Sequence, residues 1–375
     1  MTQPDPLKIF QILDKHEFNT GSVHQMFQAA AGLRERGHMV TIVSREDSLL
    51  AARAGESGVE FVSAPFSGEA DLETVRIVRN LVKTRRPDVI HVHKGRPHTL
   101  ALAGTWTDPV PAFIVNRGVS FPLTIWNRPK YRTARVDRIV CVCEQIRQVV
   151  IRTGKLPAAK VVVVYAGTDT GLFSPGSWDG GEFRREKGIP QESFLITQVG
   201  VRDWKGWREL VDAAAELRHM HPRIHVALIG CKDESDKAEI RRYAEGKGIG
   251  EAVTPVEVRD DMPSVFASSD CVTDASWAGT GITGTIREAM AMGKPTVSTD
   301  CGGNIELVSS PEVGWLIRPK DQRALVDALR AVIDDPVQAK GVGEKAMERV
   351  RNGFSKEHRL DSLEHLYREV IAGKR

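Results

Sequence analysis

The stretch SWAGTGITGTIREAMAMGKPTVSTDCGGNIELV, at residues 276–308, alternates glycine-rich segments with apolar ones. The pattern predicts a strand, a glycine-rich loop, a short helix, a second strand, a second glycine-rich loop and a further helix. Gly279, Gly281 and Gly284 would let the first loop bring its backbone close to a ligand. A helix beginning near Thr285 would point its free N–H groups and its positive dipole end into that loop, which predicts an anion-binding site.

Short apolar runs rich in β-branched residues alternate with amphipathic stretches along nearly the whole chain. The runs lie at residues 7–13, 39–43, 59–62, 88–93, 112–115, 138–143, 160–165, 193–200, 225–230, 271–275, 295–298 and 314–317. Such near-continuous apolar runs are typical of parallel strands buried on both faces. The alternation predicts an α/β fold with two doubly wound, Rossmann-like parallel sheets that face each other across a cleft, with ligands at the carboxyl ends of the strands.

A glycine- and proline-rich stretch, FSPGSWDGGEFRREKGIP at residues 173–190, separates the two groups of strands. It is typical of an inter-domain linker, so we predict one domain at residues 1–172 and a second at 173–354. The chain ends in a predicted helix at 355–375, with Ser355 as its N-cap and one apolar face.

The composition indicates a folded, soluble protein. Of the 375 residues, 41% are hydrophobic and 27% are charged, which excludes a disordered, collagen-like or coiled-coil chain. A net charge of +3 is too small to suggest a nucleic-acid coat. The five cysteines lack zinc-site spacing and fall mostly in apolar runs, no apolar run approaches a membrane span, and the first residues lack a signal-peptide core. These features predict a cytoplasmic protein with reduced thiols.

A second group of polar residues follows the predicted strand at 193–200, in the segment Gly-Val-Arg-Asp-Trp-Lys-Gly at residues 200–206. Arg202 and Lys205 would lie where a strand ends and a helix begins. Two cations at this position suit a diphosphate group. The alternative is a solvated basic turn, which the neighbouring anion loop makes less favoured.

The glycine spacing also matches a dinucleotide-binding fingerprint. Gly279, Gly281 and Gly284 fit GxGxxG, and Asp300 lies 19 residues after Gly281. Taken alone this predicts an NAD site. The match lies late in the second domain, however, whereas such a fingerprint opens its domain, so we favour the simpler anion site.

One histidine pair and one acidic pair could in principle bind a metal ion. His91 and His93 share one face of a predicted strand, but no third ligand is evident, so we favour a pair that fills the end of the strand. Asp260 and Asp261 fit a helix N-cap before Met262 better than a metal site. No metal centre is predicted.

Aromatic and basic residues mix in FPLTIWNRPKYRTARVDR, at residues 121–138. Its cations are Arg128, Lys130, Arg132, Arg135 and Arg138. The favoured interpretation is a solvated helix and loop. The alternative is a lip that contacts an anionic lipid surface or a phosphorylated acceptor, which would place the protein peripherally at the inner membrane face.

Four segments together resemble the GT-B nucleotide-sugar glycosyltransferases, specifically the large retaining group numbered family four. The most specific is REAMAMGKPTVSTDCGGNIELVSSPEVGWLIRPKDQRALVDAL, which is similar to a signature of EAMA-x-G-x-P, GG-x-x-E and G-x-L-x-x-P. The others are VEVRDDMPSVFASSDCVTDAS, VDRIVCVCEQIRQVVI and VVVVYAGTDTGLFSP. The resemblance implies an acceptor-side first domain, a donor-binding second domain and a C-terminal helix that packs back on the first.

The resemblance also implies roles for individual residues. Arg202 and Lys205 would bind the donor diphosphate and stabilise it as it leaves. Glu288 matches the second glutamate of the E-x7-E motif and would hold the ribose hydroxyls. The loop before it would offer backbone donors to the sugar and phosphate, from Gly281, Ile282, Thr283, Gly284 and Thr285.

Three further positions carry over with less similarity. Gly21 matches the glycine-rich turn after the first strand of the first domain, which in the family faces the donor. Thr280 stands where the family has the first glutamate of E-x7-E, near the donor sugar. Arg117 stands at the position of a histidine, where it would contact a phosphate or an acidic acceptor rather than act as a base.

The sequence therefore predicts a retaining, metal-independent glycosyltransferase without a bound cofactor. It would move a sugar from a UDP- or GDP-type donor to a cell-envelope glycan or glycolipid, of lipopolysaccharide or polysaccharide type. Two alternatives remain open: a nucleotide-sugar epimerase or hydrolase on the same fold, and a non-catalytic nucleotide-sugar-binding protein, which Thr280 in place of glutamate supports.

Overall fold

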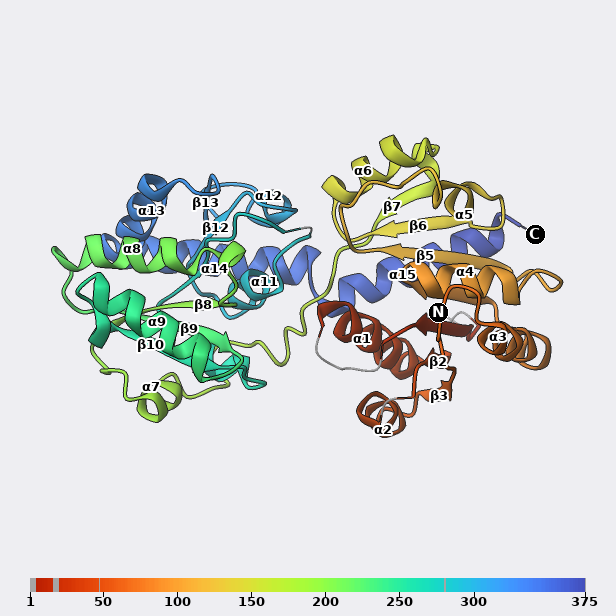
Figure 1. The fold of residues 1–375 in the computed structure, drawn as a ribbon, viewed down its shortest axis with the longest axis horizontal. Coiled ribbons are helices and arrows are strands. Elements are labelled where there is room, and N and C mark those ends of the chain that lie inside the picture. The colour runs from red at the N-terminus through yellow and green to blue at the C-terminus, as the bar shows by residue number, and fades with distance from the viewer. Residues whose placement is uncertain (1–4, 16–19, 47, 280, 375) are drawn as a thin grey trace. The chain divides into compact units, whose positions relative to one another are not determined.

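The computed structural model describes residues 5–15, 20–46, 48–279 and 281–374. The chain forms two compact units, one of Met1–Gly167 with Lys356–Arg375 and one of Thr168–Ser355 (Figure 1). Each unit is built around one parallel sheet, which confirms the predicted fold class. The division falls a few residues before the predicted boundary between residues 172 and 173.

The first unit contains a seven-stranded parallel sheet in the order β3-β2-β1-β4-β5-β6-β7. Its strands are β1 Lys8–Leu13, β2 Met39–Ser44, β3 Glu60–Ser63, β4 Val89–His93, β5 Ala112–Arg117, β6 Arg138–Cys141 and β7 Val161–Val163. Its helices are α1 Gly21–Glu35, α2 Ser48–Glu56, α3 Leu72–Arg85, α4 Gly95–Gly104, α5 Arg128–Arg132, α6 Glu144–Gly154, the single turn η1 Ala158–Lys160, and α15 Lys356–Ala372. Helices cover the sheet, so its apolar strand residues are buried on both faces.

The C-terminal helix α15 belongs to this first unit. Leu360, Leu363 and Tyr367 of α15 lie in one buried cluster with residues of α1 and the sheet. A Cβ at Gly32 of α1 would lie 2.5 Å from Leu360 Cδ1, so glycine at this position lets the two helices approach closely. The helix is therefore an integral layer of the first unit.

The second unit contains a six-stranded parallel sheet in the order β10-β9-β8-β11-β12-β13. Its strands are β8 Phe194–Val199, β9 Ile224–Cys231, β10 Val253–Glu257, β11 Cys271–Asp274, β12 Thr296–Thr299 and β13 Trp315–Ile317. Its helices are α7 Glu182–Lys187, α8 Trp207–Arg218, α9 Glu234–Gly246, α10 Met262–Ser268, α11 Gly284–Ala291, α12 Asn304–Leu307, α13 Gln322–Asp334 and α14 Pro336–Gly353, with the single turns η2 Asp203–Lys205 and η3 Gly250–Ala252.

Three details of the second unit differ from the sequence-based expectation. Strand β10 was not among the predicted apolar runs, because Pro255 and its polar neighbours break the pattern, and an edge strand tolerates proline. The stretch 173–190 is not only linker, since it contains α7, whose Phe183 is fully buried. The strand predicted at the start of 276–308 ends earlier, at Asp274.

The strand order identifies the functional edge of each sheet. The order reverses beside the first strand of each unit, between β1 and β4 and between β8 and β11. In open parallel sheets, ligands bind outside the carboxyl ends of the strands at this switch point. In the second unit the switch point lies between the two segments that carry the predicted donor residues.

Candidate functional site

Arg202 and Lys205 lie in the turn that leaves β8. Gly200 and Gly206 flank this turn with positive φ angles of 99° and 71°. A Cβ at Gly206 would lie 2.1 Å from the Ala275 carbonyl oxygen, so the turn passes against the end of β11 as only glycine allows. The close packing of the turn therefore fixes the position of the Lys205 backbone, from which its side chain extends.

Gln198 ties the same turn to β11 from within the sheet. Its side chain is fully buried near the end of β8. Its Nε2 donates to the Lys205 carbonyl over 3.1 Å, and its Oε1 accepts from the Ala275 backbone N–H over 3.2 Å. One amide thus satisfies two loop groups and holds the β8 and β11 loops together.

The two cations differ in their surroundings. The Lys205 side chain is 18% exposed, and its Nζ lies 3.5 Å from Asp274 Oδ1 and 5.0 Å from the centre of the Trp204 ring. Arg202 is exposed, and the described part of the chain offers its side chain no ion pair. The turn therefore carries Lys205, whose ammonium group is held near Asp274, and Arg202, whose side chain is exposed to solvent.

The two glycine-rich loops contact each other directly. The Gly303 N–H donates to the Gly281 carbonyl over 3.2 Å. Gly302 has a φ of 64°, and a Cβ there would lie 2.5 Å from the same Gly281 oxygen. The Thr283 N–H donates to Asn304 Oδ1 over 2.9 Å, which joins the first loop to α12. The second loop therefore shapes the first.

Helix α11 begins at Gly284, one residue earlier than expected, with Thr283 at the N-cap position. The Thr283 hydroxyl donates to Asp274 Oδ2 over 2.6 Å and makes no capping bond to the helix. The helix N-terminus is therefore left without its usual side-chain cap, and its first N–H groups suit an anionic ligand. Ile282 and Thr285 are half-buried beside it.

Glu288 lies one turn into α11 and folds back over its start. Its Oε1 would lie 3.8 Å from a Cβ at Gly284, so the carboxylate is close to the glycine-rich loop. Burial raises the pKa of Glu288, while the neighbouring Arg287 charge lowers it. A buried carboxylate with a raised pKa favours ligands that donate hydrogen bonds, such as hydroxyl groups.

The second unit thus brings most of the predicted donor residues to one sheet edge: Arg202, Lys205, Gly281, Ile282, Thr283, Gly284, Thr285 and Glu288. Thr280 lies outside the described residues. Gly21 and Arg117 belong to the first unit. The sequence-based site lacked Gln198, Asp274, Ser276 and Asn304, which connect these loops. The first three stood inside or beside an apolar run, and Asn304 followed two glycines without any sign of its partners.

Two family models match the chain. The model of glycosyl transferases group 1 covers residues 179–349, which include the donor loops, and the model of glycosyltransferase family 4 covers residues 20–172. Between them they cover every strand of the two sheets except β1. The chain belongs to the group 1 glycosyltransferases. This membership favours a sugar-nucleotide site over a dinucleotide site at Gly279–Gly284.

Characterised relatives and solved structures are similar to this glycosyltransferase over different lengths. It is 30% identical over 254 residues to D-inositol 3-phosphate glycosyltransferase 1 of Catenulispora acidiphila, an alignment that covers 64% of this chain and 59% of that protein. It is 23% identical to the UDP-Gal:alpha-D-GlcNAc-diphosphoundecaprenol alpha-1,3-galactosyltransferase of Escherichia coli, with 81% of each chain covered. A UDP complex of Anabaena Alr3699/HepE superimposes with a TM-score of 0.83 at 18% identity, covering 97% of this chain and 100% of that one. That likeness shows a shared GT-B fold.

In the first unit of the glycosyltransferase, Gly21 is the first residue of α1, and a Cβ there would have open space around it. Arg117 is the last residue of β5, and its guanidinium donates to the Phe121 carbonyl over 2.6 Å. Burial raises the pKa of the neighbouring Tyr131, while Arg117 lowers it. Arg117 is thus held at the carboxyl end of its strand, where ligands of such sheets bind.

The histidine pair fills the sheet, as predicted. His91 Nδ1 lies 2.7 Å from the Tyr367 hydroxyl, and His93 Nε2 lies 2.7 Å from Gln11 Oε1. Burial lowers the pKa of His93 to about 3, so the ring is neutral. Within the described residues no group of three or more His, Cys, Asp and Glu side chains could hold a metal ion.

The predicted cap at Asp261 is wrong in its chemistry. Asp261 occupies the N-cap position of α10, but its side chain makes no capping bond. Its Oδ1 accepts from Arg259 Nε over 2.7 Å instead, because the guanidinium offers a charged, two-pronged donor. Asp261 is therefore part of an ion-pair network with Arg259, which also pairs with Glu186.

Four of the five cysteine thiols are buried. Cys141, Cys143, Cys231 and Cys271 are buried and form no disulfide among the described residues, and Cys301 is partly exposed. Burial raises the pKa of the Cys141 and Cys271 thiols to about 12. These cysteines fill the core as small apolar groups.

The basic stretch at residues 121–138 is less solvated than expected. Lys130 Nζ donates to the Gly95 carbonyl over 2.9 Å, and Arg135 donates to the Leu102 carbonyl over 3.0 Å, so these cations hold α4. The exposed side chains of the segment include large apolar ones, with Trp126 90% and Phe121 67% exposed. In the described chain, no helix is both long enough and apolar enough to cross a bilayer.

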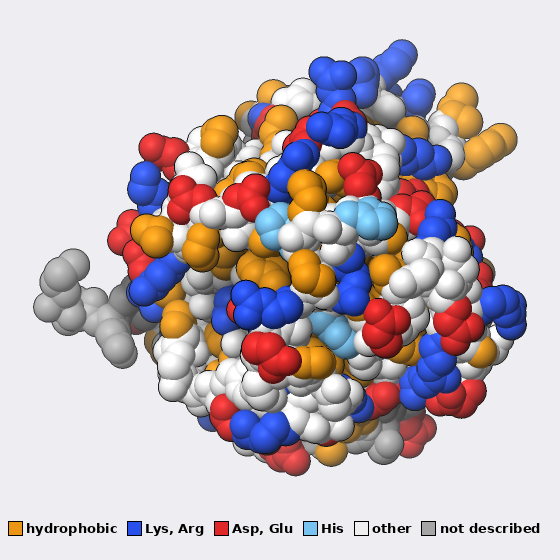
Figure 2. All heavy atoms as spheres, turned by 90° about the vertical axis from the view of Figure 1, so that its left-hand side faces the viewer, with side chains coloured by type: hydrophobic (Ala, Val, Ile, Leu, Met, Phe, Trp, Pro, Cys, Tyr) orange, Lys and Arg blue, Asp and Glu red, His pale blue; other side chains and the backbone are white. Residues whose placement is uncertain are grey.

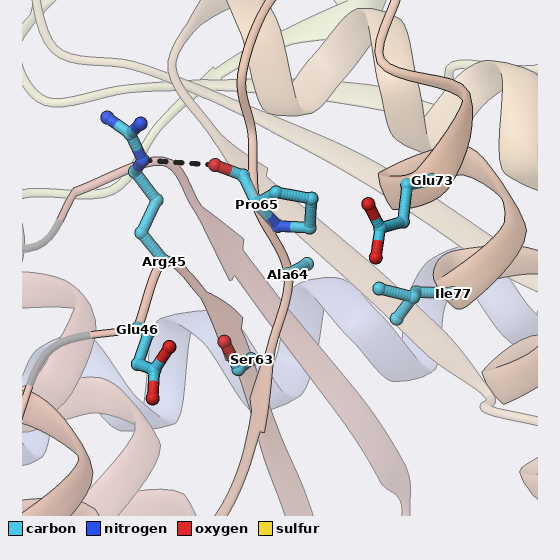
Figure 3. Close-up of a pocket in the computed structure, with 7 residues that line it drawn as sticks. All are labelled: Arg45, Glu46, Ser63, Ala64, Pro65, Glu73 and Ile77. Carbon is cyan, nitrogen blue, oxygen red and sulfur yellow. Dashed lines mark hydrogen bonds between the residues drawn. The ribbon is translucent and has the colours of Figure 1, made fainter.

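A hollow of about 490 Å³ opens at the carboxyl ends of β2 and β3 in the first unit. Its lining residues are Arg45, Glu46, Ser63, Ala64, Pro65, Glu73 and Ile77. Figure 3 shows the Glu73 and Ile77 side chains extending from α3 towards Pro65, whose carbonyl accepts from Arg45 Nε over 3.1 Å. Two carboxylates and a hydroxyl around one hollow suit a ligand rich in hydroxyl groups. No sequence motif had pointed to it.

Proposed function

We propose that this protein transfers a sugar, with retention of the anomeric configuration and without a metal ion, from a nucleoside-diphosphate sugar to a glycan or glycolipid of the cell envelope. The observation that carries the proposal is the edge formed by β8, β11 and β12, where Lys205, Arg202 and the uncapped start of α11 belong to adjacent loops.

The proposed reaction needs charge stabilisation rather than a covalent intermediate on this edge. As the bond between the anomeric carbon and the β-phosphate oxygen breaks, negative charge grows on the diphosphate. Lys205, Arg202 and the N–H groups of α11 would stabilise that charge, and one such donor is worth about 3 kcal/mol in the transition state. Glu288 would accept from the ribose hydroxyls.

The choice of donor and acceptor rests on relatives. The Escherichia coli relative named above is a UDP-galactose-dependent enzyme that acts on a lipid-linked diphosphate sugar, and the Anabaena protein binds UDP. These proteins support a UDP-type donor and a glycolipid acceptor. Figure 2 shows acidic and basic side chains interspersed over one face, in keeping with the net charge of +3.

A thermal-shift experiment tests the donor site. UDP, GDP or ADP at a hundredfold excess over its Kd should raise the melting temperature by about 5–10 °C. The Arg202→Ala, Lys205→Ala double variant should lose the shift. The matched control is Arg241→Ala with Lys247→Ala, which removes two exposed cations, one from α9 and one directly after it, and should keep the shift. A shift with NAD alone, or with none of these nucleotides, would contradict the proposal.

Two outcomes of an activity assay would favour the alternatives. Donor turnover without any acceptor would indicate an epimerase or hydrolase. Nucleotide-sugar binding without turnover, followed by transfer in the Thr280→Glu variant, would indicate a non-catalytic binding protein.

We also propose that the segment at 121–138 contacts an anionic membrane surface where a lipid-linked acceptor resides. Its exposed Phe121, Ile125 and Trp126 would enter the interfacial region, and Arg128 and Arg132 on α5 accompany them. The protein should sediment with phosphatidylglycerol vesicles, and Trp126→Ala should weaken this. Trp106→Ala removes another exposed tryptophan, 72% exposed, outside this segment and is the control. Equal sedimentation of both variants with the wild type would exclude the contact.

A further inference from the structure

The carboxylate of Asp274 lies at the end of β11, in the middle of the donor loops. Asp274 is 2% exposed. Burying an ionised carboxylate is costly unless hydrogen bonds or opposite charge compensate for the lost water. The groups that donate hydrogen bonds to this carboxylate therefore identify the segments that it connects.

Both carboxylate oxygens are occupied by donors from different segments. Oδ1 accepts from the Ser276 hydroxyl and lies 3.5 Å from Lys205 Nζ. Oδ2 accepts from the Thr283 hydroxyl over 2.6 Å and from Asn304 Nδ2 over 3.5 Å. One side chain thus connects the turn after β8, the first glycine-rich loop and α12.

Asn304 closes this network on the other side. Its Oδ1 accepts from the Thr283 backbone N–H over 2.9 Å, and its Nδ2 also donates to the Thr299 carbonyl over 3.2 Å. The residue before α11 is therefore fixed through both its side chain and its backbone. The direction in which α11 points its free N–H groups depends on these bonds.

We propose that Asp274 is a positioning residue of the donor site, one that holds the Lys205 ammonium and the start of α11 around a single point. The proposal rests on the proposed function. Because both oxygens of Asp274 are already occupied, it acts through Lys205 and Thr283 rather than by touching the donor. The group it organises is the diphosphate of a nucleoside-diphosphate sugar.

The direction in which Asp274→Asn changes the affinity for nucleotide distinguishes a positioning role from simple charge repulsion. A carboxylate near a diphosphate repels it, so its neutralisation in Asp274→Asn should tighten nucleotide binding if charge alone matters. If Asp274 positions Lys205, the same variant should bind more weakly. The fold should tolerate asparagine, because its shape is unchanged and the Thr283 hydroxyl can accept as well as donate.

The experiment is calorimetric titration of UDP, GDP and ADP into the whole protein. Asp274→Asn should weaken binding about tenfold, the effect of one displaced charge-assisted hydrogen bond. In the Lys205→Met background, the same change should cost less than about threefold, because only its effect on the start of α11 remains. A purely structural role would lower stability without this dependence on Lys205.

Asp270→Asn is the matched control, since it makes the same change at the other end of β11. Asp270 Oδ2 accepts from Arg184 and from the Leu195 N–H, both over 2.7 Å. This variant should lose stability and keep the wild-type affinity. Ser276→Ala, which keeps the carboxylate but removes one of its donors, should weaken binding and decides the matter if Asp274→Asn does not fold.

Three results would overturn the inference while leaving the proposed function intact. The first is nucleotide binding by Asp274→Asn that is as tight as in the wild type or tighter. The second is a double variant whose loss of affinity equals the product of the losses caused by Asp274→Asn and Lys205→Met alone. The third, where Asp274→Asn is unfolded, is unchanged nucleotide binding by Ser276→Ala. If the wild type binds none of the three nucleotides, the proposed function itself fails, and this inference fails with it.

Discussion

Replacement of Gly206 by alanine should disrupt the donor turn more than its backbone angle alone explains. Gly206 has a φ of 71°, which costs an alanine about 1–2 kcal/mol. A Cβ there would also lie 2.1 Å from the Ala275 carbonyl oxygen and 2.7 Å from its carbon. Backbone must move to relieve this contact, and such overpacking adds about 1–3 kcal/mol. We expect a total loss of about 2–5 kcal/mol in the free energy of unfolding.

Gly188 provides a control with nearly the same backbone angle. It follows α7 in the same unit with a φ of 67°, and a Cβ there would meet no atom within 4 Å. Gly188→Ala should therefore cost only the strain, about 1–2 kcal/mol. Urea unfolding followed by tryptophan fluorescence gives both values, and Trp207 lies directly after the turn.

The same substitution should weaken nucleotide binding, because Gly206 adjoins Lys205 in sequence and its displacement moves the ammonium group. Gly188→Ala should leave the affinity unchanged. Equal destabilisation by the two variants would show that the contact with Ala275 is relieved without cost. Wild-type affinity in a destabilised Gly206→Ala protein would refute the view that this turn positions Lys205.

Three further predictions follow from the described contacts. Burial raises the pKa of Glu288, and hydrogen bonds from ribose hydroxyls favour its ionised form, so the affinity for UDP should increase as the pH rises through that pKa. Glu288→Gln should remove this pH dependence. The same variant should also show a smaller preference for UDP over 2′-deoxy-UDP in calorimetry. Burial raises the pKa of Asp71, but hydrogen bonds from Ser67 and Thr74 outweigh this effect and lower the pKa to about 2. Asp71→Ala should therefore lower the free energy of unfolding, measured in urea at pH 7, by about 1–2 kcal/mol. This loss should disappear as the pH falls from 3.8 towards 2, where Asp71 becomes protonated in the wild type. Glu73→Gln in the hollow of the first unit should raise the KM for acceptor and leave donor affinity unchanged, whereas an unchanged acceptor KM would separate that hollow from the reaction.

The fold was predictable because its signal repeats. All twelve apolar runs overlap a strand of the structure, and their near-continuous character indicated parallel sheets. Strand β10 escaped because an edge strand needs fewer apolar residues, and only Val253 and Val256 of its five residues are buried.

The donor loops were predictable for a different reason. Glycine and cationic residues at strand ends stand out in a sequence, and they drew attention to Lys205 and the loop before α11, which the structure places at one sheet edge. Asp274 did not stand out, because it ends the apolar run CVTDA and one polar residue in such a run carries no sign of its partners. Its four donors come from three segments that only the folded sheet brings together.

The two sheets show why similar sequence positions acquire different roles. Each first strand carries a buried glutamine beside its switch point, Gln11 in β1 and Gln198 in β8. The Gln11 amide meets His93 and, at 3.5 Å, the Tyr367 hydroxyl of α15, so it helps to anchor a helix against the sheet face. The Gln198 amide bonds to the loops after β8 and β11 and so supports the donor edge. A buried glutamine must find partners in either place, and the chain segment that supplies them determines whether the residue serves stability or a ligand site.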